Sequence, residues 1–250
     1  MIIIRSEEEI RKMREAGRIV AGVLDLMEES IEVGVNTLHL DGIAGEYIRS
    51  KGGTPSFLGY QGFPKSICTS INDVVVHGIP DAATSLAEGD IIGIDVGVIL
   101  QGYHADAART YTVGKAVDPE ALRLMEVTRR SLQKGIFECR PGQFLGDISH
   151  AIQSEVEGAG FSVVVQFVGH GIGQNMHEEP QIPNYGPPRR GPKLAAGMVF
   201  ALEPMVNQGG FEVEVLEDGW TVKTKDGKLS AHFEHTVAVR DREPLVLTVN

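Results

Sequence analysis

The sequence predicts an α+β fold in which helices cover one face of an antiparallel sheet. Two observations predict it. Two helical segments followed by strand-forming segments occur twice, in the same order, along the 250 residues. A Leu-x-x-Ile step also recurs in the second helical segment of each half, at residues 40–43 and 145–148. We therefore expect one pseudo-two-fold domain over residues 1–250, although so short a repeat can also arise by chance.

The first half opens with a long amphipathic helix. Ser6 and Glu9 have the spacing of a capping box, and apolar side chains recur at helical spacing from Ile10 to Met27. A second helix follows Thr37 and ends at the two glycines at 52–53. Strands are expected over residues 67–71 and 74–77, separated by a turn at 72–73, and over 91–100 and 103–113, joined at 101–102.

The second half repeats this order. Asp118 followed by Pro119 is a helix start, and that helix runs to about Cys139. Another helix is expected over residues 145–158, and strands resume at Phe161. The five prolines between residues 180 and 192 exclude a continuous helix or a central strand there.

Composition excludes several classes of protein. The chain carries 23 Lys plus Arg against 34 Asp plus Glu, a net charge of -11, which argues against nucleic acid as a substrate. No apolar run approaches the roughly 20 residues that span a bilayer, and the amino terminus has no apolar core of signal-peptide length. Cys68 and Cys139 could pair, but we expect two reduced thiols in a cytoplasmic protein.

An acid within an apolar strand is the first candidate for chemistry. Asp95 follows four apolar or glycine residues, and a buried unpaired carboxylate is costly. With a two-residue turn after residue 100, Asp106 and His104 lie on the face of Asp95. The two carboxylates either share a proton or hold a cation between them. Alternatively, one of them points to solvent or pairs with Arg109.

Three further ligands come from the second half. His170 stands between glycines after an apolar run, Glu203 lies in an apolar strand over 198–206, and Glu234 begins another apolar strand. Four carboxylates and one imidazole are the donors of a hard-cation site. Five ligands exceed the need of one tetrahedral ion, whereas two ions roughly 3.5–4 Å apart would use all of them.

These residues point to a family. The ordered ligand set resembles the metallopeptidases of the pita-bread fold, and within them the type I methionine aminopeptidases. The resemblance extends from about residue 5 to the end of the chain and includes local motifs at residues 68–80, 95–97, 169–173, 177–186 and 200–205. It implies removal of the initiator methionine from nascent proteins and peptides whose second residue is small.

The resemblance also implies how the ligands are used. Asp95 chelates one ion, Asp106 and Glu234 bridge both, and His170 and Glu203 complete the other. A water shared by the ions loses a proton and attacks the first peptide bond, with Glu203 as the proton shuttle. The sequence does not choose among Co, Mn, Fe and Zn.

Other residues acquire roles only through the resemblance. His177 matches a residue that bonds the scissile amide, and His77 matches one near the substrate amine; without the family, both read as core histidines. Cys68 and Trp220 could likewise be ordinary core residues. The positions that match the methionine pocket are Tyr60, Phe63, Cys68, Trp220 and, at its rim, Met176.

The resemblance carries several looser implications. A monovalent cation is expected near Asn72, Val74 and Ser230, the chain is expected to be a monomer, and the ribosome is a further candidate partner. The main alternative is an X-prolyl aminopeptidase or prolidase on the same fold, although these usually carry an additional amino-terminal domain. A non-catalytic binding protein on this scaffold is a second alternative, but such proteins typically lose metal ligands.

Overall fold

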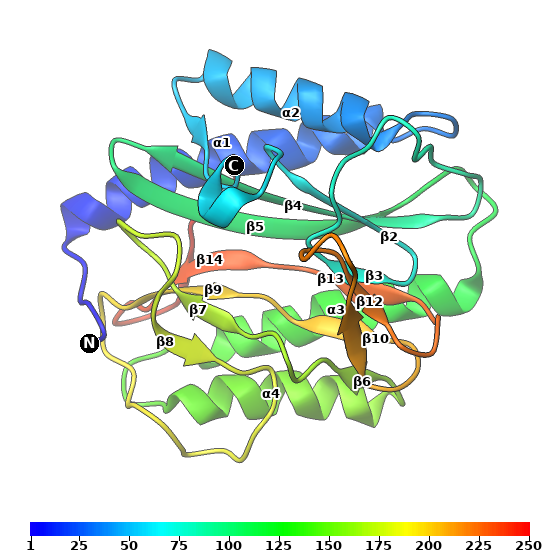
Figure 1. Ribbon diagram of the computed structural model, residues 1–250. Coiled ribbons are helices and arrows are strands. Elements are labelled where there is room, and N and C mark those ends of the chain that lie inside the picture. Colours follow the sequence, from blue (N-terminus) through cyan, green and yellow to red (C-terminus); the bar gives the residue numbers. More distant parts are fainter.

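The computed structural model describes residues 1–250. Its four long helices, α1 (Glu7–Ser30), α2 (Thr37–Ser50), α3 (Pro119–Glu138) and α4 (Leu145–Gly158), lie outside the strands, two on each side in Figure 1. All strand pairs are antiparallel, which confirms the predicted α+β class. The strands are β1 (Thr54–Pro55), β2 (Cys68–Ile71), β3 (Val74–Val76), β4 (Ile91–Leu100), β5 (Tyr103–Thr112), β6 (Ser162–Val163), β7 (Gly169–Gly171), β8 (Glu178–Ile182), β9 (Val199–Leu202), β10 (Met205–Asn207), β11 (Val213–Val215), β12 (Val222–Thr224), β13 (Ser230–His232), β14 (His235–Ala238) and β15 (Leu245–Val246).

The predicted helix starts are confirmed. The Ser6 backbone N–H donates to a Glu9 carboxylate oxygen at 2.8 Å, and the Glu9 N–H donates to Ser6 Oγ at 3.3 Å. The Ser6 hydroxyl also donates to the Glu9 carboxylate at 2.7 Å, and the two bonds donated by Ser6 lower the pKa of Glu9 to about 2. The Asp118 carboxylate accepts from the Glu120 N–H at 2.7 Å, with Pro119 in the first turn of α3. Both helices therefore begin where local capping satisfies their free N–H groups.

The long hairpin has the predicted register. Leu100 pairs with Tyr103 and Asp95 with Ala108, because the two turn residues at 101–102 both adopt positive φ, as a tight hairpin turn requires. Alternate side chains of β4 pack on α1 in one hydrophobic core, whereas Asp95 points to the opposite face.

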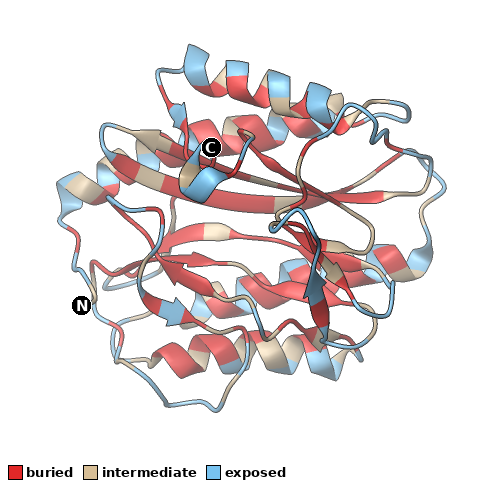
Figure 2. Cartoon of the chain, viewed as in Figure 1, coloured by how far each residue is buried: buried red, intermediate tan, exposed pale blue.

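Each half buries its own core beneath its own pair of helices. One core joins α1 and α2 to β4 and β5, and the other joins α3 and α4 to β9, β10, β13 and β14. Figure 2 shows the buried faces of the helices turned toward the strands. In both halves, the helices therefore cover the outer face of the strands, and the inner faces of the two halves are turned toward each other. This arrangement agrees with the pseudo-two-fold prediction.

The two Leu-x-x-Ile steps, at 40–43 and 145–148, do not occupy equivalent positions in the two helices. α2 and α4 each have 14 residues, and Thr37 corresponds to Leu145, the first residue of each. The equivalent of Leu40 is therefore Ile148, and both are fully buried. Positive-φ glycines flank both helices at the same spacing, at 34 and 52 and again at 142 and 160. The buried face and these turns, rather than the leucine spacing, define the repeat.

Two strand predictions need correction. The apolar run at 198–206 is interrupted at Glu203 and Pro204, since proline cannot donate to the ladder, and β9 and β10 join different sheets. β3 ends at Val76 because His77 has a φ of 59°, and it pairs with β12. Pro180, by contrast, lies within β8, an edge strand, which agrees with the prediction that the prolines exclude a central strand there.

The structure also bears on two predictions about the cysteines and about membrane spans. Cys68 and Cys139 are both buried and unpaired, as expected for reduced thiols. No helix combines the length and the apolar character needed to cross a bilayer.

Candidate metal centre and binding pocket

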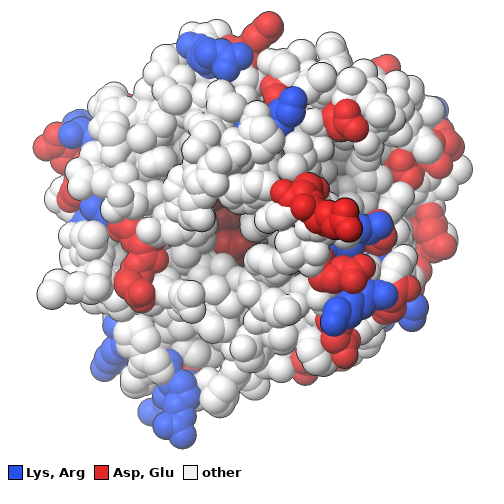
Figure 3. Space-filling model, viewed as in Figure 1, with Lys and Arg blue, Asp and Glu red and all other residues white.

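A cavity of about 220 Å³ opens between the two halves. Figure 3 shows acidic atoms at the bottom of a central hollow. Phe57 and Gln61 line the cavity although the sequence did not identify them. The structure brings every predicted ligand, catalytic and pocket residue into the wall of this cavity: Tyr60, Phe63, Cys68, His77, Asp95, Asp106, His170, Met176, His177, Glu203, Trp220 and Glu234.

The first half supplies two carboxylates from the β4–β5 hairpin. Asp95 faces Ala108 in the ladder and Asp106 faces Gly97, which makes the two acids diagonal neighbours on one face. Their carboxyl groups are close enough for each to shift the pKa of the other. One oxygen of each is buried without a hydrogen-bond partner. His104, predicted on the same face, instead has its Nδ1 2.8 Å from Ser56 Oγ and does not line the cavity.

His170 presents one ring nitrogen to the cavity. It lies in β7, where its Nδ1 donates to the Gly171 carbonyl at 2.9 Å. Its Nε2 is left facing Glu203, with Oε1 3.5 Å away. Burial lowers the pKa of His170 to about 3. The imidazole is therefore neutral at pH 7 and offers an Nε2 lone pair to a cation.

The glycines around His170 allow the main chain to approach its neighbours closely. A Cβ at Gly169 would lie 2.5 Å from the Ala201 carbonyl oxygen. At Gly171 it would overlap the Glu179 carbonyl, and at Gly173 it would overlap the Arg5 guanidinium. These contacts explain a glycine-rich motif on both sides of the histidine.

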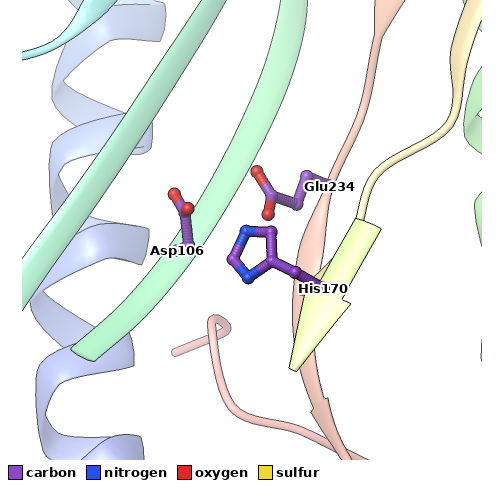
Figure 4. A group of neighbouring side chains, drawn as sticks. All are labelled: Asp106, His170 and Glu234. Carbon is purple, nitrogen blue, oxygen red and sulfur yellow. The ribbon is translucent and has the colours of Figure 1, made fainter. Parts of the chain in front are cut away.

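Glu234 completes the closest group of ligands. It precedes β14, and its N–H donates to the Ala108 carbonyl at 2.9 Å. One ligand atom each from Asp106, His170 and Glu234 lie within 4.8 Å of one another, and Figure 4 shows the three side chains turned toward a common space. Asp95 and Glu203 line the same cavity outside this closest group.

The charges in the cavity are unbalanced. Burial raises the pKa of Asp95 to about 7. Burial, together with repulsion from the other acids, raises the pKa of Asp106, Glu203 and Glu234 well above the usual range. No Lys or Arg lines the cavity. Four carboxylates, a neutral imidazole and several unpartnered buried oxygens therefore fit two divalent cations, which would neutralise the site.

The two remaining histidines are held differently. His77 adopts a left-handed backbone conformation, unusual for a residue with a side chain, and its ring lies edge-on to Phe167 and Trp220. His177 Nδ1 is 2.8 Å from the Tyr60 hydroxyl, and its ring centroid is 4.1 Å from that of His170. Burial lowers the pKa of His77 to about 4 and also lowers the pKa of His177. Both rings are neutral near pH 7.

Part of the cavity wall is apolar. Phe63 packs edge-on against Trp220 at 5.2 Å between ring centroids, and against Phe57 at 6.5 Å. Cys68 is the ladder partner of Asp95, so it lies at the boundary between the acids and the aromatic rings.

The sequence indicated a close approach to β4 at Gly97 without identifying Phe57 as the residue that makes it. A Cβ at Gly97 would lie 2.8 Å from the Phe57 ring and 3.3 Å from the Met176 methyl. A glycine two residues after an acid in an apolar strand indicates such a close approach. Gln61, in a positive-φ turn beside the aromatic rings, carried no comparable signal.

Comparison with known proteins identifies the family of this chain. It matches the profile of metallopeptidase family M24 over residues 11–241. A methionine aminopeptidase of Clostridium perfringens is 52% identical over 249 residues, which cover 100% of this chain and 99% of that protein. Crystal structures of methionine aminopeptidases from Thermotoga maritima and Rickettsia prowazekii have TM-scores of 0.98 and 0.97, at 44% and 45% identity, and 100% of each chain is covered.

The relationship to proline-specific peptidases is more distant. A prolidase from Pyrococcus furiosus is 20% identical with a TM-score of 0.77, covering 99% of this chain and 66% of that one, and shares the fold. Identity near 50% over the full chain is found instead with methionine aminopeptidases. The chain therefore belongs to metallopeptidase family M24 and, within it, to the methionine aminopeptidases.

Proposed function

We propose that this chain is a metal-dependent hydrolase, a single catalytic domain over residues 1–250, that removes the N-terminal methionine from peptides and nascent proteins whose second residue is small. The observation that carries the proposal is one cavity in which four carboxylates and a neutral imidazole, with no basic side chain, adjoin an aromatic pocket. The acids suit divalent cations and the rings suit an apolar side chain.

The ligand roles in this proposal follow the expectations from the sequence. Asp95 would hold one ion, Asp106 and Glu234 would be shared by the two ions, and His170 and Glu203 would complete the second. Bound divalent cations supply Lewis acidity and lower the pKa of a water. Carboxylates with one imidazole accept Co, Mn, Fe or Zn, so cellular availability selects the metal.

Three side chains act on the substrate in this proposal. Glu203 Oε1 lies 3.5 Å from His170 Nε2 at the centre of the site, and with divalent cations favouring its ionised form, the Glu203 carboxylate would accept the proton of the attacking water. The Tyr60 hydroxyl lies 2.8 Å from His177 Nδ1. In the tautomer whose Nδ1 accepts this hydrogen bond, His177 Nε2 carries a hydrogen that would bond the scissile amide. His77, neutral and held between aromatic rings, faces the substrate amine.

The aromatic part of the cavity is the proposed methionine pocket. Phe63 and Trp220 offer ring edges and faces, and the sulfur atoms of Cys68 and Met176 are polarizable. A flexible thioether packs well against both kinds of surface. Tyr60 closes the pocket beside His177, which brings the side-chain pocket and the scissile bond together.

Further parts of the proposal concern ions and partners. A monovalent cation is proposed near Asn72, Val74 and Ser230; the Ser230 N–H donates to the Asn72 carbonyl at 2.8 Å, so these segments lie together. We also propose that the chain is a cytoplasmic monomer and that the ribosome, as the source of nascent chains, is a partner.

The test combines substrate and metal. Met-Ala-Ser and Ala-Pro-Gly peptides are incubated with the chain after chelation and after addition of each candidate cation. Release of methionine from the first peptide alone, and only with a divalent cation, is expected. Cleavage of Ala-Pro-Gly instead would favour an X-prolyl aminopeptidase, and cleavage that survives chelation would overturn the metal assignment. Metal analysis of protein purified without added metal would identify the bound ion.

A further inference from the structure

The two halves of the molecule meet beside the metal centre in an unusual junction. β5 of the first half and residues 232–236 of the second half run alongside each other (Figure 1), yet one backbone hydrogen bond joins them, from Glu234 N–H to the Ala108 carbonyl. On either side of that bond, a threonine hydroxyl makes the hydrogen bonds to the opposite main chain that backbone groups make in a regular sheet. The pairs that face one another, in antiparallel order, are Asp106 with Thr236, Ala108 with Glu234, and Thr110 with His232.

Each threonine satisfies both peptide groups of the residue opposite. Thr236 Oγ1 accepts from the Asp106 N–H at 2.8 Å and donates to the Asp106 carbonyl at 2.8 Å. Thr110 Oγ1 accepts from the His232 N–H at 3.0 Å and donates to the His232 carbonyl at 2.8 Å. All four of these residues are buried, so water cannot replace either hydroxyl.

The main chain of Thr236 is already engaged elsewhere. Its carbonyl accepts from the Leu247 N–H at 2.9 Å, and β14 pairs with β9 on its other edge. Only the side chain of Thr236 is therefore free to bond the backbone of Asp106. A valine would fill the same space and keep β14 in its sheet, but it would leave both peptide groups of Asp106 without partners.

The junction carries the two carboxylates that come from opposite halves. Asp106 stands on β5, Glu234 stands between β13 and β14, and their ligand atoms lie within 4.8 Å of each other and of His170. The distance between these two carboxylates depends on how the halves are held together at this point. The Thr236 hydroxyl bonds the main chain of Asp106 itself, and the Thr110 hydroxyl bonds His232, two residues before Glu234.

We propose that Thr236 is a positioning residue of the metal centre: its hydroxyl holds the main chain of Asp106 so that the Asp106 carboxylate stands at bridging distance from Glu234. Thr110 supports the Glu234 side of the junction through His232. The inference rests on the proposed function only in requiring that the site binds divalent cations.

Two matched pairs of variants isolate the hydroxyl. Wild-type Thr236 and Thr236→Val differ by a hydroxyl exchanged for a methyl, and Thr236→Ser and Thr236→Ala differ by the hydroxyl alone. Mn²⁺ binding to the chelator-treated full chain is measured by titration calorimetry, with the free energy of unfolding in urea measured alongside. We expect Thr236→Val to weaken Mn²⁺ binding about 10–100-fold, as for partners that orient metal ligands, and Thr236→Ser to bind close to wild type.

The control is a threonine with a similar environment away from the cavity. Thr128 in α3 is fully buried and donates to the Leu124 carbonyl at 2.7 Å, so Thr128→Val tests whether loss of any buried hydroxyl lowers affinity. Mn²⁺ affinity should not change in this variant. If Thr236→Val does not fold, the comparison of Mn²⁺ affinity between Thr236→Ser and Thr236→Ala tests the role of the hydroxyl.

The outcomes separate the two proposals. Equal Mn²⁺ affinity within both pairs, in folded protein, would show that the hydroxyl does not position the ligand, while the proposed function would stand. Absence of Mn²⁺ binding to the unaltered chain would overturn the metal site itself. Affinity lost in Thr128→Val as in Thr236→Val would assign the effect to general destabilisation and overturn the inference.

Discussion

The Arg5–Glu178 ion pair supports the strongest prediction about stability. The Arg5 side chain is 3% exposed and the Glu178 side chain 7%, and the guanidinium also lies against Gly173. Replacing Arg5 by methionine keeps most of the packed volume but leaves the Glu178 carboxylate buried without its counterion. Breaking a buried pair in this way costs about 3–5 kcal/mol. For a domain of this size, Tm should fall by about 6–20 °C.

A double-mutant cycle tests this reasoning. Urea unfolding is measured for the unaltered chain, Arg5→Met, Glu178→Gln and the double variant. Glutamine can still accept the Asn175 N–H bond that Glu178 Oε1 accepts at 3.1 Å. The double variant should be more stable than the two single losses predict, because neither buried charge remains.

The control is an exposed pair. Arg240 contacts Glu7, whose side chain is 79% exposed, and Arg240→Met should cost no more than about 1 kcal/mol. Losses of Arg5→Met and Glu178→Gln that simply add in the double variant would refute the idea that each charge depends on the other. Because Glu178 directly follows His177, kcat measured on the same variants shows whether the ion pair also orders that histidine.

Three further predictions concern the metal centre. Burial raises the pKa of Asp95 to about 7 from a usual 3.8, so the folded metal-free protein binds more protons than the unfolded chain between these pH values. The free energy of unfolding should therefore fall as pH rises from 4 to 7. A free energy of unfolding that stays constant over this pH range, measured in EDTA, would contradict this prediction. Asp106→Asn should abolish turnover yet stabilise the metal-free protein at pH 7.5, because it removes a carboxyl group whose charged form is disfavoured by burial and by the neighbouring acids. Near-normal hydrolysis would exclude the proposed role of Asp106 as a shared ligand. His177→Ala should lower kcat about 10²–10³-fold with little change in KM, and Tyr60→Phe less so; a change in KM alone would argue against a transition-state contact.

Local patterns in the sequence determined several features correctly. The capping residues Ser6 and Asp118 predicted where α1 and α3 begin, since a cap acts within one turn. The two-residue turn predicted the β4–β5 register, and the two-residue period of a strand then placed Asp95 and Asp106 on one face. The four predicted acid ligands line the cavity, as expected because an acid in an apolar segment is tolerated only where something neutralises it.

The tertiary structure alone decided the contacts between distant segments. The pairing of β3 with β12, the burial of Arg5 against Gly173 and the place of Phe57 in the cavity join segments separated by tens of residues or more, and no short-range pattern encodes such partners. The correct register of the repeat required knowing which helix faces are buried. Thr236 reads in the sequence as an ordinary strand residue, and its hydroxyl acquires a role only because packing of the two halves brings it to the backbone of Asp106.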